Sequence, residues 1–143
     1  MNLEQNNGLE ISKMTEGRTL NGHKVDPATD DLDIVVMDGA GDGGASHRYL
    51  VVGFDWLPPP DESSLGCVDI RFQNGPIAEK GVNGLTQEIL LEICADRLRG
   101  FQSGAFACRE NAIALTKIEE AQMWLQKRTR ARMGRGVEGT HEL

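Results

Sequence analysis

Four cations lie close together near the end of the chain, in the stretch QKRTRAR at residues 126–132. They are Lys127, Arg128, Arg130 and Arg132, and they span less than two turns of a helix with about 3.6 residues per turn. A guanidinium group presents planar, forked donors that match the oxygens of a phosphate. The whole chain is nevertheless acidic, with a formal net charge of −7 at pH 7. The basic stretch is therefore a local feature, which indicates a small anionic ligand.

The positions of these cations around the helix separate them into two groups. At about 100° per residue, Arg128 and Arg132 fall beside an apolar stripe that also runs past Asn111, whereas Arg130 falls well away from it. Arginines at i and i+4 on one face can grip an anion from two sides. For Lys127 and Arg130 a simpler interpretation is favoured, because cations in the last helical turn complement the helix dipole by about 0.3–1 kcal/mol each.

The length of the helix constrains how a pocket could be built. Asn111 and Arg128 are 17 residues apart, which is about 25 Å at about 1.5 Å per residue. They cannot hold the same small molecule from one chain. If two copies of the helix pack antiparallel, the arginine end of one meets the Asn111 end of the other, so the pocket would lie twice at a homodimer interface. Phe101, just before the long helix, could offer an aromatic face to a base.

A glycine-rich motif after a predicted strand is the next candidate for ligand binding. The stretch GAGDGG contains G-x-G-x-x-G at Gly39, Gly41 and Gly44. A dinucleotide fingerprint requires a helix immediately afterwards, whose N-terminus holds the pyrophosphate. Here the following residues, HRYLVVGFDW, are typical of a strand, and Asp42 adds negative charge to the loop. A hairpin loop is therefore favoured over a Rossmann site.

The sequence offers no convincing catalytic or metal-binding set. Asp38, Ser46 and His47 could suggest a hydrolase triad, but the chain has no G-x-S-x-G elbow. The three histidines lack metal-ligand spacing, and the three cysteines lack a C-x-x-C pair, so they are interpreted as reduced thiols. We therefore expect no catalytic residue, no metal and no cofactor.

Composition narrows the class of protein. The chain has 143 residues, of which 39% are hydrophobic and 26% charged, which is typical of a single globular domain. No apolar run approaches the 18 or so residues of a membrane-spanning helix, and the N-terminus does not resemble a secretory signal. The acidic balance argues against DNA as a partner, because DNA binding requires a basic face.

The elements that must position these residues change type along the chain. Residues 1–16 are polar and aperiodic and predict a disordered tail. Residues 17–143 predict a single domain, with a β-sheet part at 17–76 and a helical hairpin at 84–135. Segments rich in β-branched and aromatic residues predict strands, at 32–38, 47–56 and 67–73. An Asn-Gly pair at 21–22 predicts a tight hairpin between two short extended runs.

Two helices are expected in the second half of the chain. The first has a plausible cap at Thr86 and a stop at Gly100, and its apolar face includes Ile89 and Ile93. The second and longer helix runs from about residue 109 to residue 133. Strands followed by helices indicate an α+β protein, with an N-terminal antiparallel sheet and an antiparallel two-helix hairpin that dimerises through its long helix.

Long stretches of the sequence resemble a known family. FQNGP, DRLRGFQSG, RENAIALTKIEEAQMWL and RGVEGTH are similar to the phage anti-Thoeris defence proteins of the first type, over residues 18–141. The helical hairpin also resembles a fold shared with a phage anti-CBASS sponge. The resemblance implies an anti-defence sponge in the host bacterial cytoplasm. Such a protein binds an immune signal without degrading it, and in this family the signal is glycocyclic ADP-ribose, which a TIR-domain enzyme makes from NAD.

The family's ligand contacts can be carried onto matching residues. The resemblance places the adenine contacts at Phe101 and Asn111 and the phosphate contacts at Arg128 and Arg132, in a pocket between protomers. Some members assemble as trimers of dimers and hold cyclic trinucleotides at a second kind of site, so a dimer and a hexamer both stay open.

Two further arginines, Arg48 and Arg109, are additional candidates for contacts with an anion. The loops at 39–46 and 57–66 cannot be aligned with the family, so contacts from them stay open.

Two other classes of function are weighed against the sponge. A phosphodiesterase-like enzyme would degrade the signal, but it needs a general base or a nucleophile beside the ligand. The Phe, Asn and Arg side chains of the expected pocket do not supply one at neutral pH. An assembly protein, in which the basic turn only docks a partner, would have no affinity for a small molecule. The sponge is the favoured interpretation.

Overall fold

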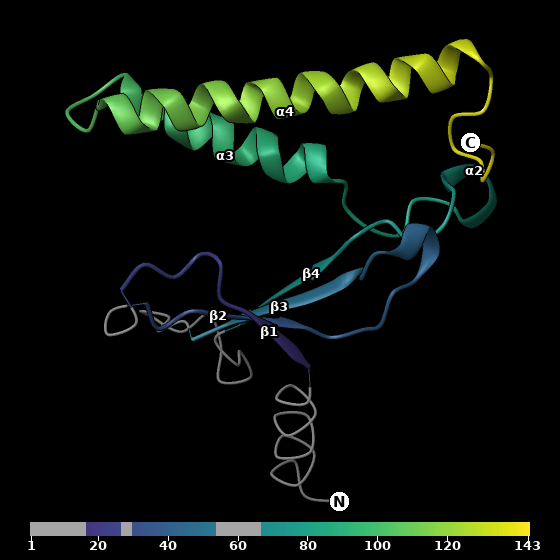
Figure 1. The fold of residues 1–143 in the computed structure, drawn as a ribbon, viewed down its shortest axis with the longest axis horizontal. Coiled ribbons are helices and arrows are strands. Elements are labelled where there is room, and N and C mark those ends of the chain that lie inside the picture. Colours follow the sequence, from purple (N-terminus) through teal and green to yellow (C-terminus); the bar gives the residue numbers. More distant parts are fainter. Residues whose placement is uncertain (1–16, 27–29, 54–66) are drawn as a thin grey trace, which may run out of the picture. The chain divides into compact units, whose positions relative to one another are not determined.

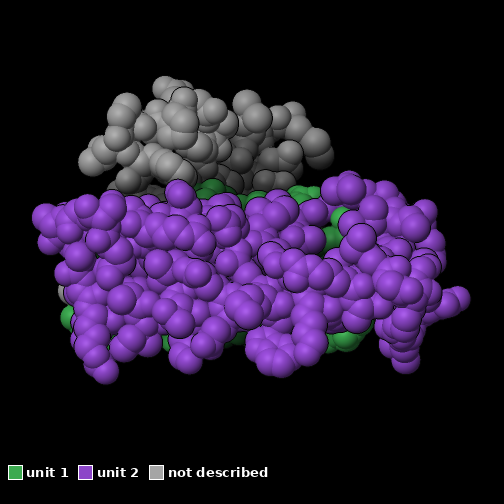
Figure 2. Space-filling model, turned by 90° about the horizontal axis from the view of Figure 1, so that it is seen from above, with its two compact units in different colours: residues 1–74 green, residues 75–143 purple. Residues whose placement is uncertain are grey.

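The computed structural model describes residues 17–26, 30–53 and 67–143, which fall into two compact units divided between Asn74 and Gly75 (Figures 1 and 2). Unit 1 is a sheet and unit 2 is helical, so the expected α+β class is confirmed. The expected disordered tail at 1–16, the loop at 57–66 and the last three residues of the strand expected at 47–56 lie outside the described residues. The interpretation of residues 17–143 as one domain stays a prediction.

The sheet of unit 1 has four antiparallel strands in sequence order. They are β1 (Arg18–Leu20), β2 (Asp33–Val36), β3 (Arg48–Val52) and β4 (Cys67–Arg71). Side chains alternate between the two faces of a strand, so Val35 and Leu50, which are directly opposite each other, share a face. Val35, Val36 and Leu50 are the buried apolar residues of this unit in the described ranges.

The prediction of a tight hairpin at residues 21–22 is wrong. The described residues after this turn, 23–26 and 30–32, form no strand, and β1 pairs with β2 instead. The side chains that follow the turn explain the difference, because they bind the start of β2. His23 Nε2 lies 2.9 Å from the carbonyl oxygen of Leu32, and Lys24 forms an ion pair with Asp33. The turn therefore closes a longer connection between β1 and β2.

The glycine-rich loop connects β2 to β3 and is not followed by a helix. It contains a single 3-10 turn, η1 (Asp42–Gly44), in which Gly43 and Gly44 have φ angles of 75° and 80°. Glycine tolerates this left-handed conformation without a steric penalty. Because β3 runs antiparallel to β2, the loop belongs to a β-hairpin, and the preference for a hairpin loop over a Rossmann site is confirmed.

Unit 2 is an antiparallel helical hairpin preceded by one helical turn (Figure 1). The elements are α2 (Ile77–Lys80), α3 (Gln87–Gln102) and α4 (Arg109–Gly134). The sequence predicted the starts of both long helices and placed their ends within two residues. It did not predict α2, which lies in a segment interpreted as a turn-rich connection. Cys108 caps α4, because its Sγ accepts from the backbone N–H of Asn111 at 3.5 Å.

The two long helices pack along each other through a narrow face. Ala95 of α3 is completely buried, and Gln122 of α4 donates to the Glu92 carboxylate at 2.8 Å. Ile89 and Ile93, which the sequence placed on the apolar face of α3, are 46% and 54% exposed in the single chain. The helix therefore carries a second apolar stripe that its own hairpin does not cover.

Candidate functional site

The four cations of residues 126–132 have different environments on α4. Lys127 Nζ lies 4.8 Å from the centroid of the Trp124 ring, an ordinary cation–π distance. Arg130 donates to the Gln126 side chain at 3.3 Å. These two cations therefore contact their own helix surface.

Arg128 is exposed, and it has no hydrogen-bond or ion-pair partner among the residues that the structure describes. Its guanidinium group keeps its N–H donors available to a ligand. This is the arrangement expected of an anion contact, because a binding residue needs donors that the fold itself does not use.

Arg132, one turn further on, is buried with 9% exposure, and its guanidinium group bonds the end of its own chain. Its Nε donates to the Glu138 carboxylate at 3.0 Å, and its Nη1 donates to the Glu142 carbonyl at 2.7 Å. Its Nη2 donates to the carbonyls of Val137 and Thr140 at 2.8 and 2.9 Å. Four of its five N–H donors are thus used within residues 137–142. One N–H of Arg132 accordingly has no acceptor among the described residues.

The residues expected to contact adenine lie at the opposite end of the hairpin. α4 is continuous from Arg109 to Gly134, so Asn111 and Arg128 are about 25 Å apart along its axis. Phe101 is in the last turn of α3, just before the connection to α4. Phe101 and Asn111 therefore both lie near the turn of the hairpin. The separation of Asn111 from Arg128 is the one that helix geometry predicted.

Two residues beside Phe101 were missed by sequence reasoning. The Arg97 guanidinium carbon lies 5.4 Å from the centroid of the Phe101 ring. The rings of Phe101 and Phe106 are 6.2 Å apart at an interplanar angle of 76°. The i, i+4 spacing of Arg97 and Phe101 was a readable signal, since such residues are neighbours on a helix surface.

Arg109 lies at the start of α4, on an open and shallow face of that helix. The same face carries Ala112, Ile113, Thr116 and Lys117. Lys117 is 3.2 Å from the Glu120 carboxylate, so part of its charge is already neutralised.

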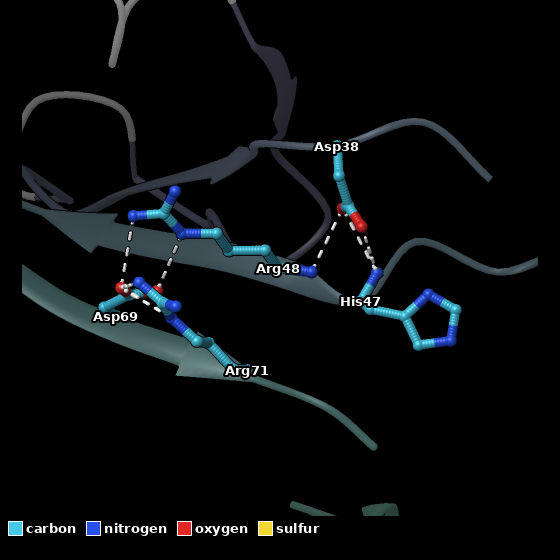
Figure 3. A network of polar contacts seen from close by, with 5 residues as sticks. All are labelled: Asp38, His47, Arg48, Asp69 and Arg71. Atoms are coloured by element: carbon cyan, nitrogen blue, oxygen red, sulfur yellow. Dashed lines mark hydrogen bonds and ion pairs between the residues drawn. The ribbon is translucent and has the colours of Figure 1, made fainter. Parts of the chain in front are cut away.

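Arg48 belongs to unit 1, where it shares the carboxylate of Asp69 with Arg71 (Figure 3). Arg48 donates to Asp69 at 3.2 Å and Arg71 at 2.9 Å. Burial alone would raise the pKa of Asp69, but the hydrogen bonds and charges of both arginines outweigh it and hold the pKa below its usual value. Part of the positive charge of Arg48 is thus already neutralised by the sheet.

The possible hydrolase triad is not assembled. The Asp38 carboxylate accepts from the backbone N–H groups of His47 and Arg48 at 2.9 and 3.0 Å, and the His47 ring points away from it (Figure 3). Ser46 Oγ donates to the Asp38 carbonyl at 3.2 Å. Burial raises the pKa of Asp38, but these backbone hydrogen bonds outweigh the effect and lower it overall. Asp38 therefore closes the base of the 39–46 loop.

The described residues offer neither a metal site nor a membrane-spanning helix. In the ranges 17–26, 30–53 and 67–143, no group of three or more His, Cys, Asp or Glu residues is arranged to hold a metal ion. Among the helices in these ranges, none combines the length and the apolar character needed to cross a membrane.

Comparison with known proteins confirms the resemblance found in the sequence. Residues 67–130 match the model of the Acb2/Tad1 hairpin domain, which covers β4, both long helices up to Arg130, and therefore Phe101, Asn111 and Arg128. The chain is also 56% identical over 102 residues to a protein named Thoeris anti-defense 1 from Bacillus phage SBSphiJ7. That match spans 71% of this chain and 66% of the relative, which is just under two thirds of the relative's length.

Proposed function

Because this chain belongs to the family of proteins with the Acb2/Tad1 hairpin domain, we propose that it is a viral protein that counters Thoeris defence by binding a host immune signal. The proposed signal is glycocyclic ADP-ribose, which the protein holds intact as a sponge in the host bacterial cytoplasm. The similarity to a protein named Thoeris anti-defense 1 supports the biological role. The observation that carries the binding role is Arg128, an exposed arginine without a partner in the described part of the chain.

The proposed pocket takes residues from two copies of the chain. Phe101 and Asn111 of one copy contact the adenine, where the Asn111 amide can pair with its donor and acceptor edge. Arg128 of the other copy contacts the phosphates, together with Arg132 through its remaining N–H. The separation of about 25 Å along α4 supports this division, because no small ligand spans it within one chain.

Exposed apolar side chains support association of the hairpins. Ile93 on α3 and Met123 and Trp124 on α4 are 54%, 66% and 68% exposed. An association that covers these side chains would remove their apolar surface from water, which is favourable. We expect a homodimer that pairs through α4, or a trimer of such dimers.

A cyclic trinucleotide is a second kind of ligand in this proposal, and Arg109 at the start of α4 is a candidate contact to one of its phosphates. Arg48 is a further candidate anion contact, and an anion there would compete with Asp69 for its donors.

A sponge and an enzyme differ in what happens to the bound ligand. The protein is incubated with glycocyclic ADP-ribose and filtered, then denatured by heat, and both fractions are analysed by mass spectrometry. A sponge removes the ligand from the filtrate and returns it unchanged after heating. Because it acts by stoichiometry, it requires nanomolar affinity, about −12 kcal/mol.

Two other results would contradict the proposal. Conversion of the ligand to a product would show the phosphodiesterase-like enzyme instead. Ligand that stays in the filtrate would mean that the basic turn serves an assembly role or that the signal is a different nucleotide.

A further inference from the structure

The turn between α3 and α4 is ordered by polar contacts that do not involve the side chain of Phe106. The Gln102 side chain donates to the Cys108 carbonyl at 3.1 Å and accepts from the Cys108 N–H at 2.9 Å. Ser103 Oγ donates to the Gly100 carbonyl at 2.8 Å. The two Gln102–Cys108 bonds join the ends of the turn directly, and the Ser103 bond closes the end of α3. The turn conformation is therefore defined by its backbone and by Gln102.

Phe106 lies inside this turn with 75% of its surface exposed. Aromatic side chains usually bury a large apolar area, so a ring this exposed contributes little to folding. Its ring contacts that of Phe101, which is itself 38% exposed. Phe101 and Phe106 together form what we call the aromatic corner, because their planes meet at 76°.

The geometry of the aromatic corner suits a planar base. A base that stacks on one ring presents its edge to the face of the other, which is the favourable T-shaped arrangement for aromatic groups. The Arg97 guanidinium adds a cation 5.4 Å from the Phe101 centroid, and among the described residues no carboxylate is paired with Arg97. A base and a phosphate can therefore be recognised side by side.

We propose that Phe106 and Arg97 are ligand-contacting residues, with Phe106 as the second aromatic wall around an adenine and Arg97 as a contact to its adjoining phosphate. This inference rests on the proposed function, because it deepens the Phe101–Asn111 half of the same pocket. It also changes the charge distribution of that pocket. The diphosphate would be held from both sides, by Arg97 of the copy that stacks the base and by Arg128 of its partner.

The test uses the full-length protein and calorimetric titration with glycocyclic ADP-ribose. Phe106→Ala and Phe106→Leu remove the ring, and Phe106→Tyr keeps it. When an aromatic ring that stacks on a base is removed, affinity falls by about 5- to 150-fold. We expect that loss for the Ala and Leu variants and near wild-type affinity for Tyr. Val82→Ala is the matched control, because Val82 is an apolar residue with 78% exposure outside the hairpin turn.

Titration with a ligand that carries a different base distinguishes the loss of stacking from a general change in the turn. Wild type and Phe106→Ala are also titrated with the hypoxanthine analogue of the ligand. Stacking depends little on base identity, so Phe106→Ala should lower the affinity for both ligands by the same factor. Arg97→Gln should flatten the dependence of affinity on salt concentration, because a phosphate contact is lost.

The outcomes separate this inference from the proposed function. If Phe106→Ala binds as tightly as wild type, or if Phe106→Leu binds as tightly as Phe106→Tyr, Phe106 does not stack on the base. The proposed function as a sponge would be unaffected by that result. An unchanged salt dependence in Arg97→Gln overturns the phosphate contact. If wild type binds neither ligand, the proposed function itself fails, and the inference fails with it.

Discussion

Arg128 and Arg132 are separated by one turn of α4, yet the first is exposed without a partner in the described residues and the second is buried with four hydrogen bonds. The pair resembles a clamp in the sequence because both residues have the same type and lie on one stripe. In the structure, residues 137–142 fold back and place their oxygens around the Arg132 guanidinium. The two arginines therefore have different environments. The C-terminal segment binds the Arg132 guanidinium, whereas the described residues leave the Arg128 donors unused, which supports the proposed anion contact at Arg128.

Replacing Arg128 should affect binding and leave folding unchanged. We expect Arg128→Ala to lower the affinity for glycocyclic ADP-ribose by about tenfold or more, because a charge-assisted contact of about 1.5–3 kcal/mol is lost. Its thermal unfolding temperature should match wild type, since the side chain makes no hydrogen bond or ion pair with the described residues. Arg130→Ala, which removes a cation whose partner among the described residues is Gln126, is the matched control and should bind normally. Equal losses in both variants would indicate general electrostatic attraction.

Replacing Arg132 should loosen the C-terminal segment. Arg132→Ala leaves the carbonyls of Val137, Thr140 and Glu142 without their donor, and each unmade hydrogen bond costs about 0.5–1.5 kcal/mol. We expect faster amide hydrogen exchange in residues 137–143 and little change in α3. Arg132→Lys should fail to restore protection, because an ammonium group cannot reproduce the four-bond fork. Wild-type exchange rates in Arg132→Ala would contradict the structural role.

Particular residues show what the sequence could and could not predict. The long helix and the separation of Asn111 from Arg128 followed from periodicity and rise, because these are local properties of the chain. The burial of Arg132 did not follow, since its partners are mostly backbone carbonyls, which every sequence offers. The exposure of Ile93 was also missed, because helix α3 has two apolar stripes and the pattern alone does not say which one packs on α4. The hairpin prediction failed for a similar reason, because the sequence does not show that His23 and Lys24 contact the start of β2.

The stability of the sheet should depend on pH through the ionisation of Asp38. The pKa of Asp38 is lower in the folded protein than in the unfolded chain. The ionised carboxylate therefore stabilises the folded state at pH values above the unfolded pKa of about 3.9. This stabilisation is lost as the pH falls through the folded pKa. We expect Asp38→Asn to lower the free energy of unfolding by about 1 kcal/mol at pH 7. The difference from wild type should shrink at pH 3 in urea titrations. The same difference at both pH values would show that the charge of Asp38 is irrelevant.

Two glycines should respond to alanine in opposite directions. Gly53 has a φ of 103°, and an added Cβ would collide with the carbonyl oxygen of Asp31. Gly53→Ala should therefore destabilise the sheet by about 1–3 kcal/mol. Gly100 is inside α3 with open space around it, so Gly100→Ala should stabilise by up to about 1 kcal/mol. Urea unfolding of both variants checks the pair, and a stable Gly53→Ala would contradict the close approach.

The strongest test of a pocket built from two chains is to mix two defective variants. Asn111→Ala and Arg128→Ala each damage both symmetric pockets of a homodimer. In a mixed dimer, one pocket receives the intact Asn111 of one chain and the intact Arg128 of the other, while the second pocket receives both substitutions. After the two variants are denatured together and refolded at equal concentration, half of the dimers should be mixed. About one high-affinity site per four chains should then return in a titration with glycocyclic ADP-ribose. Because α4 keeps these residues about 25 Å apart within one chain, a mixture as defective as its components would exclude the shared pocket.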